Sequence, residues 1–192
     1  STASVVRSWK RLADAMHIDF NSAPFVHGIP SIANVRRIAP GISESDAEHW
    51  QARHLHMEID DTEGVVALEG AMALLRALDS ARIPWAIATG CRHGLGEKRQ
   101  EVAGIPKPPV FVMAGDYTRG KPDPEPFVLA AQRLGVDPSR TVVVEDAPSG
   151  IAAGVAAGAT VIAVVETHDR HELSDADYVV DDLHELLDLL LG

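Results

Sequence analysis

The chain has 192 residues, 46% of them hydrophobic, and a formal net charge of −11. This length and apolar content suffice for one full domain, or for a domain with a small companion. The negative charge repels phosphate backbones, which argues against nucleic acid or an anionic membrane as a partner. The single cysteine, Cys91, excludes an intrachain disulfide, and no apolar run is long enough for a membrane span. We therefore expect a cytoplasmic protein.

The first third of the chain has a helical pattern. Between residues 3 and 66, apolar side chains recur every three or four positions, and no convincing strand pattern is found. The clearest example is the set Val5, Trp9, Leu12 and Met16. We therefore expect residues 1–67 to form a small helical domain.

Three histidines in this segment raise the question of a metal site. They are His49, His54 and His56, and no two of them are four residues apart. A pair of histidines that binds a metal on one face of a helix needs that separation. We therefore expect these side chains on a solvated or pocket-facing surface.

From Leu68 onward, short apolar runs alternate with helical stretches. The runs predict strands at Trp85–Ala88, Val110–Met113, Val142–Val144, Val161–Val165 and Tyr178–Val180. The stretches between and around them predict helices at Glu69–Ala81, Leu95–Val102, Pro124–Leu134, Gly150–Ala157 and Leu183–Leu191. This alternation is typical of parallel strands that are covered on both faces. Residues 68–192 are therefore predicted to form a doubly wound α/β domain with right-handed crossovers.

Polar residues follow three of the predicted strands at their carboxyl ends, where ligands bind in such sheets. Thr89 and Gly90 follow the first strand, and Lys121 comes a few residues after the second. Glu145 and Asp146 follow the third strand. Threonine donates a hydrogen bond, lysine offers a compact positive charge, and carboxylates are hard oxygen ligands for Mg²⁺. The pattern predicts a site for a phosphate group and a divalent cation.

Each of these residues also has a purely structural interpretation. Glu145 and Asp146 could cap the next helix or oppose its dipole. Thr89 could be a helix N-cap, and Lys121 could be a surface lysine in a proline-rich turn. Their convergence at neighbouring strand ends favours the ligand site.

Three motifs at these residues resemble those of the haloacid dehalogenase-like hydrolases. They are WAIAT with Thr89, GKPDPEPF with Lys121, and VVVEDAPSGIAAGVAAG with Glu145 and Asp146. The resemblance covers nearly the whole chain and is to the subgroup of capped sugar- and polyol-phosphate phosphatases and β-phosphoglucomutase-like enzymes. It implies a helical cap domain over 1–67 and a Rossmann-like core over 68–192.

The resemblance implies a Mg²⁺-dependent phosphatase that acts on a small phosphorylated metabolite, a sugar or polyol phosphate. In such enzymes an aspartate attacks phosphorus, and water hydrolyses the resulting aspartyl-phosphate. Thr89 and Gly90 would bind the phosphate, and Lys121 would bridge the phosphate and the nucleophile. Asp146 would hold the Mg²⁺, with Glu145 as a second ligand, direct or through water.

One cap element also carries the resemblance. The sequence HGIP at 27–30 matches a His-Gly element that several glycerol- and sugar-phosphate phosphatases show. His27 and Gly28 are therefore expected near the substrate, although His27 could equally be a packing residue.

The first motif of the family, Asp-x-Asp-Gly-Thr at the end of the first core strand, is missing. The sequence IDDTEG at 59–64 follows no strand, and DAD at 175–177 precedes an apolar run. In the family the motif lies just upstream of the cap, its strand is central in the sheet, and this chain begins with Ser1 rather than Met. We therefore expect the nucleophile and the first core strand upstream of Ser1, and we expect the 192 residues alone to be inactive.

Two other functions stay open at this point. One is a phosphosugar mutase, but mutase-like members carry an arginine just after the cap glycine, where this chain has Ile29, Pro30 and Ser31. The other is a non-catalytic phosphate-binding relative, which absence of the upstream motif would favour. Without a heptad repeat or a large apolar surface stripe, a monomer is favoured.

Overall fold

The computed structural model describes all residues of the chain except 1, 23–24, 27–28 and 192. None of the helices in this described part is long and apolar enough to cross a membrane. The chain divides into two compact units. The first contains Ser1–Val66 and Glu97–Gly104, and the second contains Ala67–Gly96 and Ile105–Gly192. The assignment of a cap to 1–67 and of a catalytic core to 68–192 stays a prediction.

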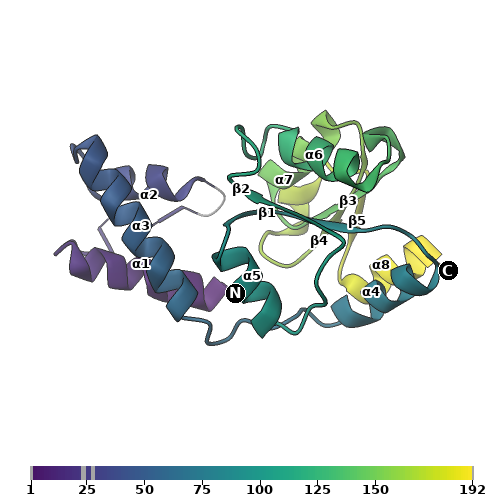
Figure 1. Ribbon diagram of the computed structural model, residues 1–192, viewed down its shortest axis with the longest axis horizontal. Helices are drawn as coiled ribbons and strands as arrows, with labels where there is room; N and C mark the ends of the chain where they lie inside the picture. The colour runs from purple at the N-terminus through teal and green to yellow at the C-terminus, as the bar shows by residue number, and fades with distance from the viewer. Residues whose placement is uncertain (1, 23–24, 27–28, 192) are drawn as a thin grey trace. The chain divides into compact units, whose positions relative to one another are not determined.

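The first unit is helical, as the apolar periodicity predicted. Its helices are α1 (Thr2–Ala15), α2 (Ser31–Ile38), α3 (Glu44–Asp60) and the part of α5 (Leu95–Val102) from residue 97 onward (Figure 1). Ser43 caps α3, because its side chain accepts a hydrogen bond from the Asp46 N–H. The apolar faces of the helices meet in one core, formed by Trp9, Leu12, Val35, Ile38 and Ala47.

His54 is buried in this unit, so its predicted surface position is wrong. The residue is 1% exposed, and its ring lies over that of Trp9 with the centroids 3.8 Å apart. Its Nε2 is 3.1 Å from the hydroxyl oxygen of Ser8. The physical reason is helical geometry: His54 lies two turns after Ala47 on the buried face of α3.

A buried ion pair accompanies this histidine. Arg99 in α5 donates to Oε1 of Glu58 at 3.0 Å, and Oε2 of Glu58 lies 3.4 Å from Nδ1 of His54. Burial lowers the pKa of His54 to about 4, with a further contribution from the positive charge of Arg99. Burial raises the pKa of Glu58, and Arg99 opposes this shift. The imidazole is therefore neutral near pH 7, and the ion pair links α5 to α3.

The second unit contains all five predicted strands, each within a few residues of its predicted bounds. They are β1 (Ala86–Arg92), β2 (Val110–Ala114), β3 (Val142–Glu145), β4 (Thr160–Val164) and β5 (Tyr178–Val180). All pairings are parallel, which confirms the expected sheet type. The strands form two sheets, one of order β1-β2 and one of order β3-β4-β5 (Figure 1).

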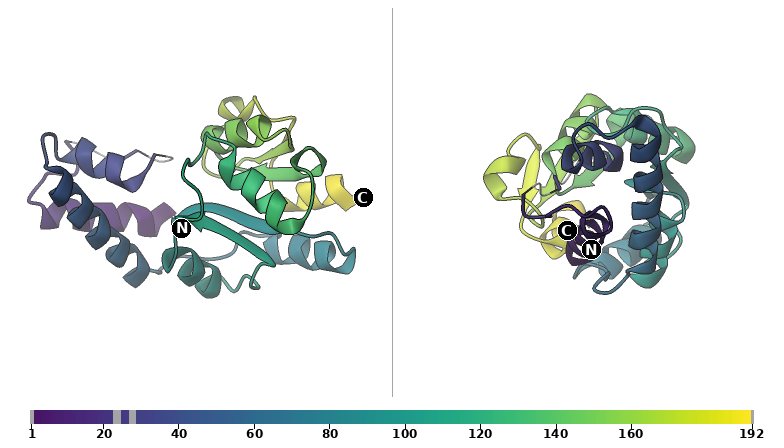
Figure 2. Two further views of the ribbon diagram at one scale, coloured as in Figure 1. Left: turned by 45° about the horizontal axis from the view of Figure 1, so that its top comes forward. Right: turned by 90° about the vertical axis from the view of Figure 1, so that its left-hand side faces the viewer.

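Helices cover both faces of the three-stranded sheet. α7 (Pro148–Ala156) covers one face, and α4 (Ala71–Ser80) and α8 (Leu183–Leu191) cover the other, while α6 (Glu125–Leu134) packs on β1 and β2 (Figure 2). Two short 3-10 helices lie at Pro138–Arg140 and Arg170–Leu173. Against one face lies a core that includes Val143, Ile151 and Val161. Against the other lies a core that includes Leu74, Ile162 and Leu186. The predicted α/β fold class is confirmed.

The two sheets are separated by a groove. β1 pairs only with β2, and β3 pairs only with β4, among the residues that the structure describes. A groove of about 740 Å³ is lined by residues 86–88 of β1 and residues 142–145 of β3. We call it the β1–β3 groove.

Candidate active site

The side chain of Lys121 lies between Ala88 in β1 and the carboxyl end of β3. Its Nζ donates to the carbonyl oxygen of Ala88 in β1 at 3.3 Å, and to the carboxylate of Glu145 at the end of β3. The ammonium group also lies 4.8 Å from the centroid of the Phe127 ring. With 20% of its side chain exposed, Lys121 is not the solvated surface lysine of the structural interpretation.

Thr89 lies inside β1, which runs further than the predicted end at Ala88. The pairing with β2 is irregular between Ala88 and Arg92. The hydroxyl oxygen of Thr89 accepts from the Cys91 N–H at 3.1 Å, and its carbonyl accepts from the Tyr117 hydroxyl at 3.2 Å. Thr89 is therefore not a helix N-cap, and no described residue accepts its hydroxyl proton, which can be donated to a ligand.

The space beside Gly90 is open. A Cβ atom at this position would meet no other atom within 4 Å. The backbone of β1 is therefore accessible to a ligand at the point where its regular pairing ends.

Glu145 is held against the start of α7. Its side chain is 9% exposed, and a Cβ atom on Gly150 would overlap its carboxylate, so this close approach requires glycine. The N-cap of α7 is Ala147, with no side-chain capping bond. Neither Glu145 nor Asp146 therefore caps the helix, although Glu145 lies close enough to the start of α7 to oppose the helix dipole.

Asp146 is fixed by the loop that follows β4. The Thr167 hydroxyl donates to its Oδ2 at 2.7 Å, and Nδ1 of His168 lies 3.0 Å from its carbonyl oxygen. No described residue bonds its Oδ1. The sequence reasoning missed Thr167 and His168. They follow the carboxyl end of β4, so reading that strand end as well would have found them.

Asp116 orders the loop that leads from β2 to Lys121. Its Oδ2 accepts from the Met113 N–H at 3.1 Å and from Arg133 at 3.0 Å, and its Oδ1 lies 3.1 Å from Nε2 of His93. The hydrogen bond from Met113, together with those from Arg133 and His93, lowers the pKa of Asp116 to about 2. The carboxylate stays ionised, and the loop keeps this anchor at neutral pH.

One aspartate in each of the two Asp-rich segments has a structural partner. Asp61, in the first unit, accepts two hydrogen bonds from Arg7, at 2.9 and 2.7 Å. In the second unit, Oδ2 of Asp177 accepts from the Val161 N–H at 2.8 Å. Both oxygens of Asp61 and one oxygen of Asp177 are therefore engaged in bonds within the protein.

Glu145 and Asp146 can supply oxygen ligands to a divalent cation. Within the described part of the chain, no group of three or more His, Cys, Asp or Glu side chains is placed to hold a metal ion. Mg²⁺ does not need such a cage, because one or two carboxylates, water and a substrate phosphate commonly bind it. Lys121, Glu145 and Asp146 together carry one net negative charge, which would repel a phosphate dianion. The residues present therefore fit Mg²⁺, whose charge would reverse that repulsion.

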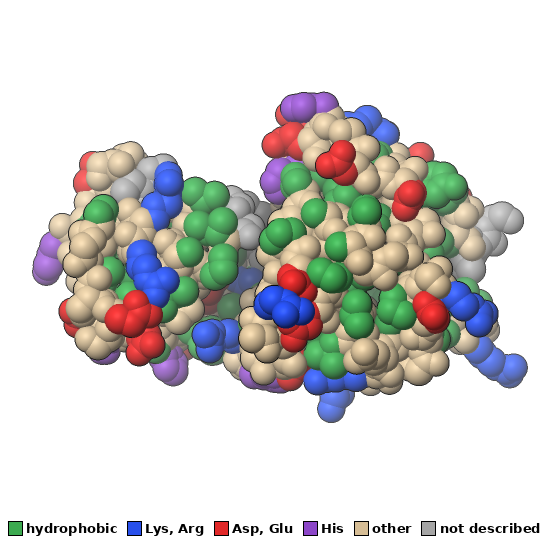
Figure 3. Space-filling view, turned by 90° about the horizontal axis from the view of Figure 1, so that it is seen from above, with side chains coloured by type: hydrophobic (Ala, Val, Ile, Leu, Met, Phe, Trp, Pro, Cys, Tyr) green, Lys and Arg blue, Asp and Glu red, His purple; other side chains and the backbone are tan. Residues whose placement is uncertain are grey.

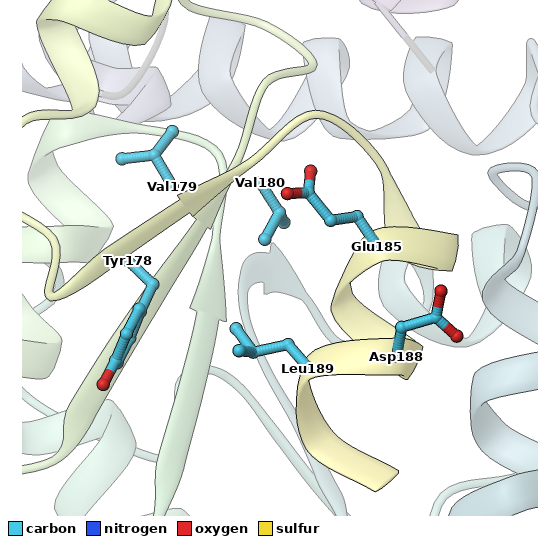
Figure 4. Close-up of a pocket in the computed structure, with 6 residues that line it drawn as sticks. All are labelled: Tyr178, Val179, Val180, Glu185, Asp188 and Leu189. Atoms are coloured by element: carbon cyan, nitrogen blue, oxygen red, sulfur yellow. The ribbon is translucent and has the colours of Figure 1, made fainter. Parts of the chain in front are cut away.

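The predicted cap residues and the other surfaces of the protein do not extend this candidate site. His27 and Gly28 lie outside the described residues. A hollow of about 360 Å³ between β5 and α8 is lined by two carboxylates and no basic side chain, and does not suit a phosphate group (Figure 4). On the face shown in Figure 3, acidic and basic side chains are interspersed rather than gathered by sign.

Comparison with known proteins decides the family. A family model described as a haloacid dehalogenase-like hydrolase matches residues 9–158. The chain belongs to the haloacid dehalogenase-like hydrolases. This hydrolase is 44% identical over 162 residues to Hexitol phosphatase A of Escherichia coli, with 84% of this chain and 75% of that relative covered. It is 36% identical over 175 residues to Validoxylamine A 7'-phosphate phosphatase of Streptomyces hygroscopicus subsp. limoneus, with 83% and 82% covered.

The fold of this hydrolase is also that of solved structures. A β-phosphoglucomutase from Clostridium difficile matches with a TM-score of 0.82 and 24% identity, with 96% of this chain and 86% of that chain covered. At this identity the likeness shows the fold, and it confirms the α/β class. The relatives named as phosphatases support the predicted class of enzyme, a phosphoric monoester hydrolase.

Proposed function

We propose that this haloacid dehalogenase-like hydrolase is a cytoplasmic, Mg²⁺-dependent phosphatase of a small sugar or polyol phosphate. The observation that carries the proposal is the position of Lys121, which bonds Ala88 in β1, next to Thr89, and Glu145 at the end of β3. The similarity to relatives named Hexitol phosphatase A and Validoxylamine A 7'-phosphate phosphatase supports this substrate class.

The phosphate group binds at the end of β1 in this proposal. Thr89 donates its hydroxyl proton to a phosphate oxygen, and the open space at Gly90 admits the group. The ammonium group of Lys121 then donates a hydrogen bond to the phosphate as well as to Glu145. Its charge is then placed where negative charge develops during transfer, in a partly buried setting that strengthens the interaction.

Asp146 is the proposed Mg²⁺ ligand, through the Oδ1 that no described residue bonds. Glu145 serves as a second ligand, directly or through water. The ion, when bound, neutralises charge on the transferring phosphoryl group. Thr167 holds the Asp146 carboxylate in one orientation.

The attacking group is proposed to be an aspartate upstream of Ser1, as the resemblance to the family implies. Its carboxylate oxygen bonds to phosphorus as the bond from phosphorus to the sugar oxygen breaks. A second upstream aspartate gives the leaving oxygen its proton. Water, deprotonated by the same group, then hydrolyses the aspartyl-phosphate and releases inorganic phosphate.

Phosphate release by the native polypeptide, including any upstream residues, tests this function. The assay uses hexitol, glycerol and aldose phosphates, with Mg²⁺ and with a chelator. We expect release that needs Mg²⁺ and favours sugar or polyol phosphates. Failure to hydrolyse any phosphomonoester contradicts the proposal, and conversion of a sugar phosphate to its isomer without phosphate release favours a mutase.

A further inference from the structure

The loop that joins β2 to α6 bonds two successive carbonyl groups of β1. It contains residues 115–124. Lys121 in this loop donates to the carbonyl oxygen of Ala88 at 3.3 Å. The hydroxyl of Tyr117 donates to the carbonyl oxygen of Thr89 at 3.2 Å. Tyr117, to which the proposed function gives no role, therefore connects the backbone of a proposed phosphate-binding residue to the loop that carries the lysine.

The carbonyl of Thr89 lies where β1 departs from regular pairing with β2. Regular pairing stops after Ala88 and resumes at Arg92. Over this interval β1 contributes residues 89–91, whereas β2 contributes only Met113. Extra residues in one strand form a β-bulge, which disrupts the ladder and changes the direction of side chains, often next to an active site. The ladder therefore does not fix the conformation of this segment, and contacts from outside the strand pair are needed to do so.

Tyr117 lies between two anchored positions of its loop. On one side, the carboxylate of Asp116 accepts from a backbone N–H of β2 at 3.1 Å. On the other side, the carboxylate of Glu125 accepts from the backbone N–H groups of Thr118 and Arg119, at 2.9 and 3.0 Å. These backbone bonds hold the pKa of Glu125 below its ordinary value, so this anchor stays ionised at neutral pH. The loop therefore holds Tyr117 in a defined position.

The surroundings of Tyr117 fix its ring and keep its hydroxyl protonated. The ring packs against Gly120, which precedes the lysine, because a Cβ atom on this glycine would lie 3.5 Å from Cε2 of the ring. Burial raises the pKa of Tyr117, with smaller contributions from Cys91 and Asp116. The hydroxyl therefore keeps its proton at neutral pH and remains a hydrogen-bond donor to Thr89.

We propose that Tyr117 is a positioning residue for phosphate binding. Its hydroxyl, by bonding the carbonyl of Thr89, holds this residue in the orientation in which the Thr89 hydroxyl donates to the phosphate group. The same loop carries Lys121, so the loop sets the two phosphate-binding side chains relative to each other. The contact between Tyr117 and Thr89 does not depend on the proposed function, whereas the binding of phosphate at Thr89 rests on it.

Tyr117→Phe in the native polypeptide tests the proposal, because it keeps the ring and removes the hydroxyl. We expect the KM for the best sugar or polyol phosphate and the Ki for inorganic phosphate, a product, to rise together by about 5-fold. We expect kcat to stay nearly unchanged, because the contact with phosphate acts alike in the bound substrate and in the transition state. The matched control is Tyr178→Phe, at an exposed position on β5, which should leave both constants unaltered.

Two results of this experiment overturn the proposal. One is a Tyr117→Phe variant with the KM and the Ki of the unsubstituted protein. The other is a fall in kcat with both of these constants unaltered. A purely structural role would lower the fraction of folded, active molecules without changing the affinity of the remaining ones.

A double-mutant cycle shows whether Tyr117 acts through Thr89. Thr89→Val keeps the shape of the side chain and removes the hydroxyl that donates to the phosphate in the proposal. In the Thr89→Val background, Tyr117→Phe should change the Ki for inorganic phosphate by less than about 2-fold. Equal effects of Tyr117→Phe with and without the Thr89 hydroxyl overturn the proposal.

A binding measurement separates this proposal from the proposed function. If the unsubstituted polypeptide hydrolyses no phosphomonoester, the proposed function fails. The Kd for inorganic phosphate in the presence of Mg²⁺, measured by calorimetry, then replaces the KM and the Ki. Binding that Tyr117→Phe weakens by about 5-fold supports the position of Tyr117, and equal binding or no binding overturns it.

Discussion

Lys121, in the loop after β2, forms a salt bridge with Glu145, the last residue of β3. The carboxylate is 9% exposed and the lysine side chain 20%. Removing one member of a buried pair leaves an uncompensated charge, which costs more than the pair contributes. Substitutions at this pair are therefore expected to change both the stability of the second unit and the proposed binding of phosphate, and the two effects need separate measurements.

Replacement of Lys121 in the native polypeptide is expected to reduce turnover strongly. Lys121→Met keeps the apolar stem but removes the charge at the proposed phosphate site, so kcat/KM should fall by about 100-fold or more. Thermal unfolding shows whether the variant is folded, and Lys107→Met, at an exposed position, is the matched control. A folded Lys121→Met variant with nearly full activity would show that the lysine has no part in catalysis.

Substitutions at two glycines of α7 distinguish an effect on packing from an effect on catalysis. An added Cβ at Gly150 overlaps the Glu145 carboxylate, whereas one at Gly154 lies 2.8 Å from a methyl of Val161. Both Gly→Ala variants should lower the Tm, by about 5 °C, because each overpacks its surroundings. Only Gly150→Ala should reduce turnover per folded molecule. Equal activity of the two folded variants would mean that the position of Glu145 is unimportant.

Thr167 is expected to support Mg²⁺ binding through Asp146. Thr167→Val keeps the shape of the side chain but removes the 2.7 Å hydrogen bond, so the Kd for Mg²⁺ should rise by about 10-fold. Titration calorimetry with Mg²⁺ alone measures this without turnover. Thr160→Val, an exposed position at the start of β4, should leave the Kd unchanged. If the two variants bind Mg²⁺ alike, the hydrogen bond does not orient the metal ligand.

The low pKa of His54 predicts that the protein loses stability in mild acid. Its pKa is about 4 in the folded chain against an ordinary 6.5, so below pH 6.5 the unfolded chain takes up a proton that the folded chain does not. The contribution of the neutral His54 to the free energy of unfolding is fully present above pH 6.5 and is lost as the pH falls toward 4. Between pH 7 and pH 5 it amounts to about 2 kcal/mol of unfolding free energy. Glu58, whose pKa burial raises, acts in the opposite direction.

The effect of His54 is therefore measured as a difference between variants. Urea unfolding at pH 7 and pH 5 should show a smaller loss of stability for His54→Gln than for the unsubstituted protein. His56→Gln, an exposed position on the same helix, should show an unaltered loss. An identical pH response of His54→Gln and the unsubstituted protein would mean that the imidazole is not excluded from protonation.

The strands were predictable because buried parallel strands are apolar throughout, a local property of the sequence. The meeting of Lys121 with Glu145 was also predictable, since both follow strands whose carboxyl ends share one edge. The groove between the two sheets could not be predicted from local patterns in the sequence. Which strands pair is a non-local property, and no local pattern in β1 or β3 shows that each leaves one edge open.

The burial of His54 shows a different limit of sequence reasoning. A histidine on a helix that is otherwise polar looks like a surface residue. Its position depends on Trp9 and Ser8, more than 40 residues earlier, and on Arg99, which compensates the neighbouring Glu58. The pattern of apolar residues within α3 gives no information about these contacts, because they are made with residues outside the helix.

The first unit is built from two separate stretches of the polypeptide, and this matters for any attempt to exchange it between hydrolases. A graft of residues 1–66 would bring α1, α2 and α3 but leave Arg99 behind in the recipient's sequence. Glu58 would then face an apolar interior without its guanidinium partner. A chimaera that keeps this unit intact has to carry residues 97–104 as well, so the natural exchange module is a discontinuous pair of segments.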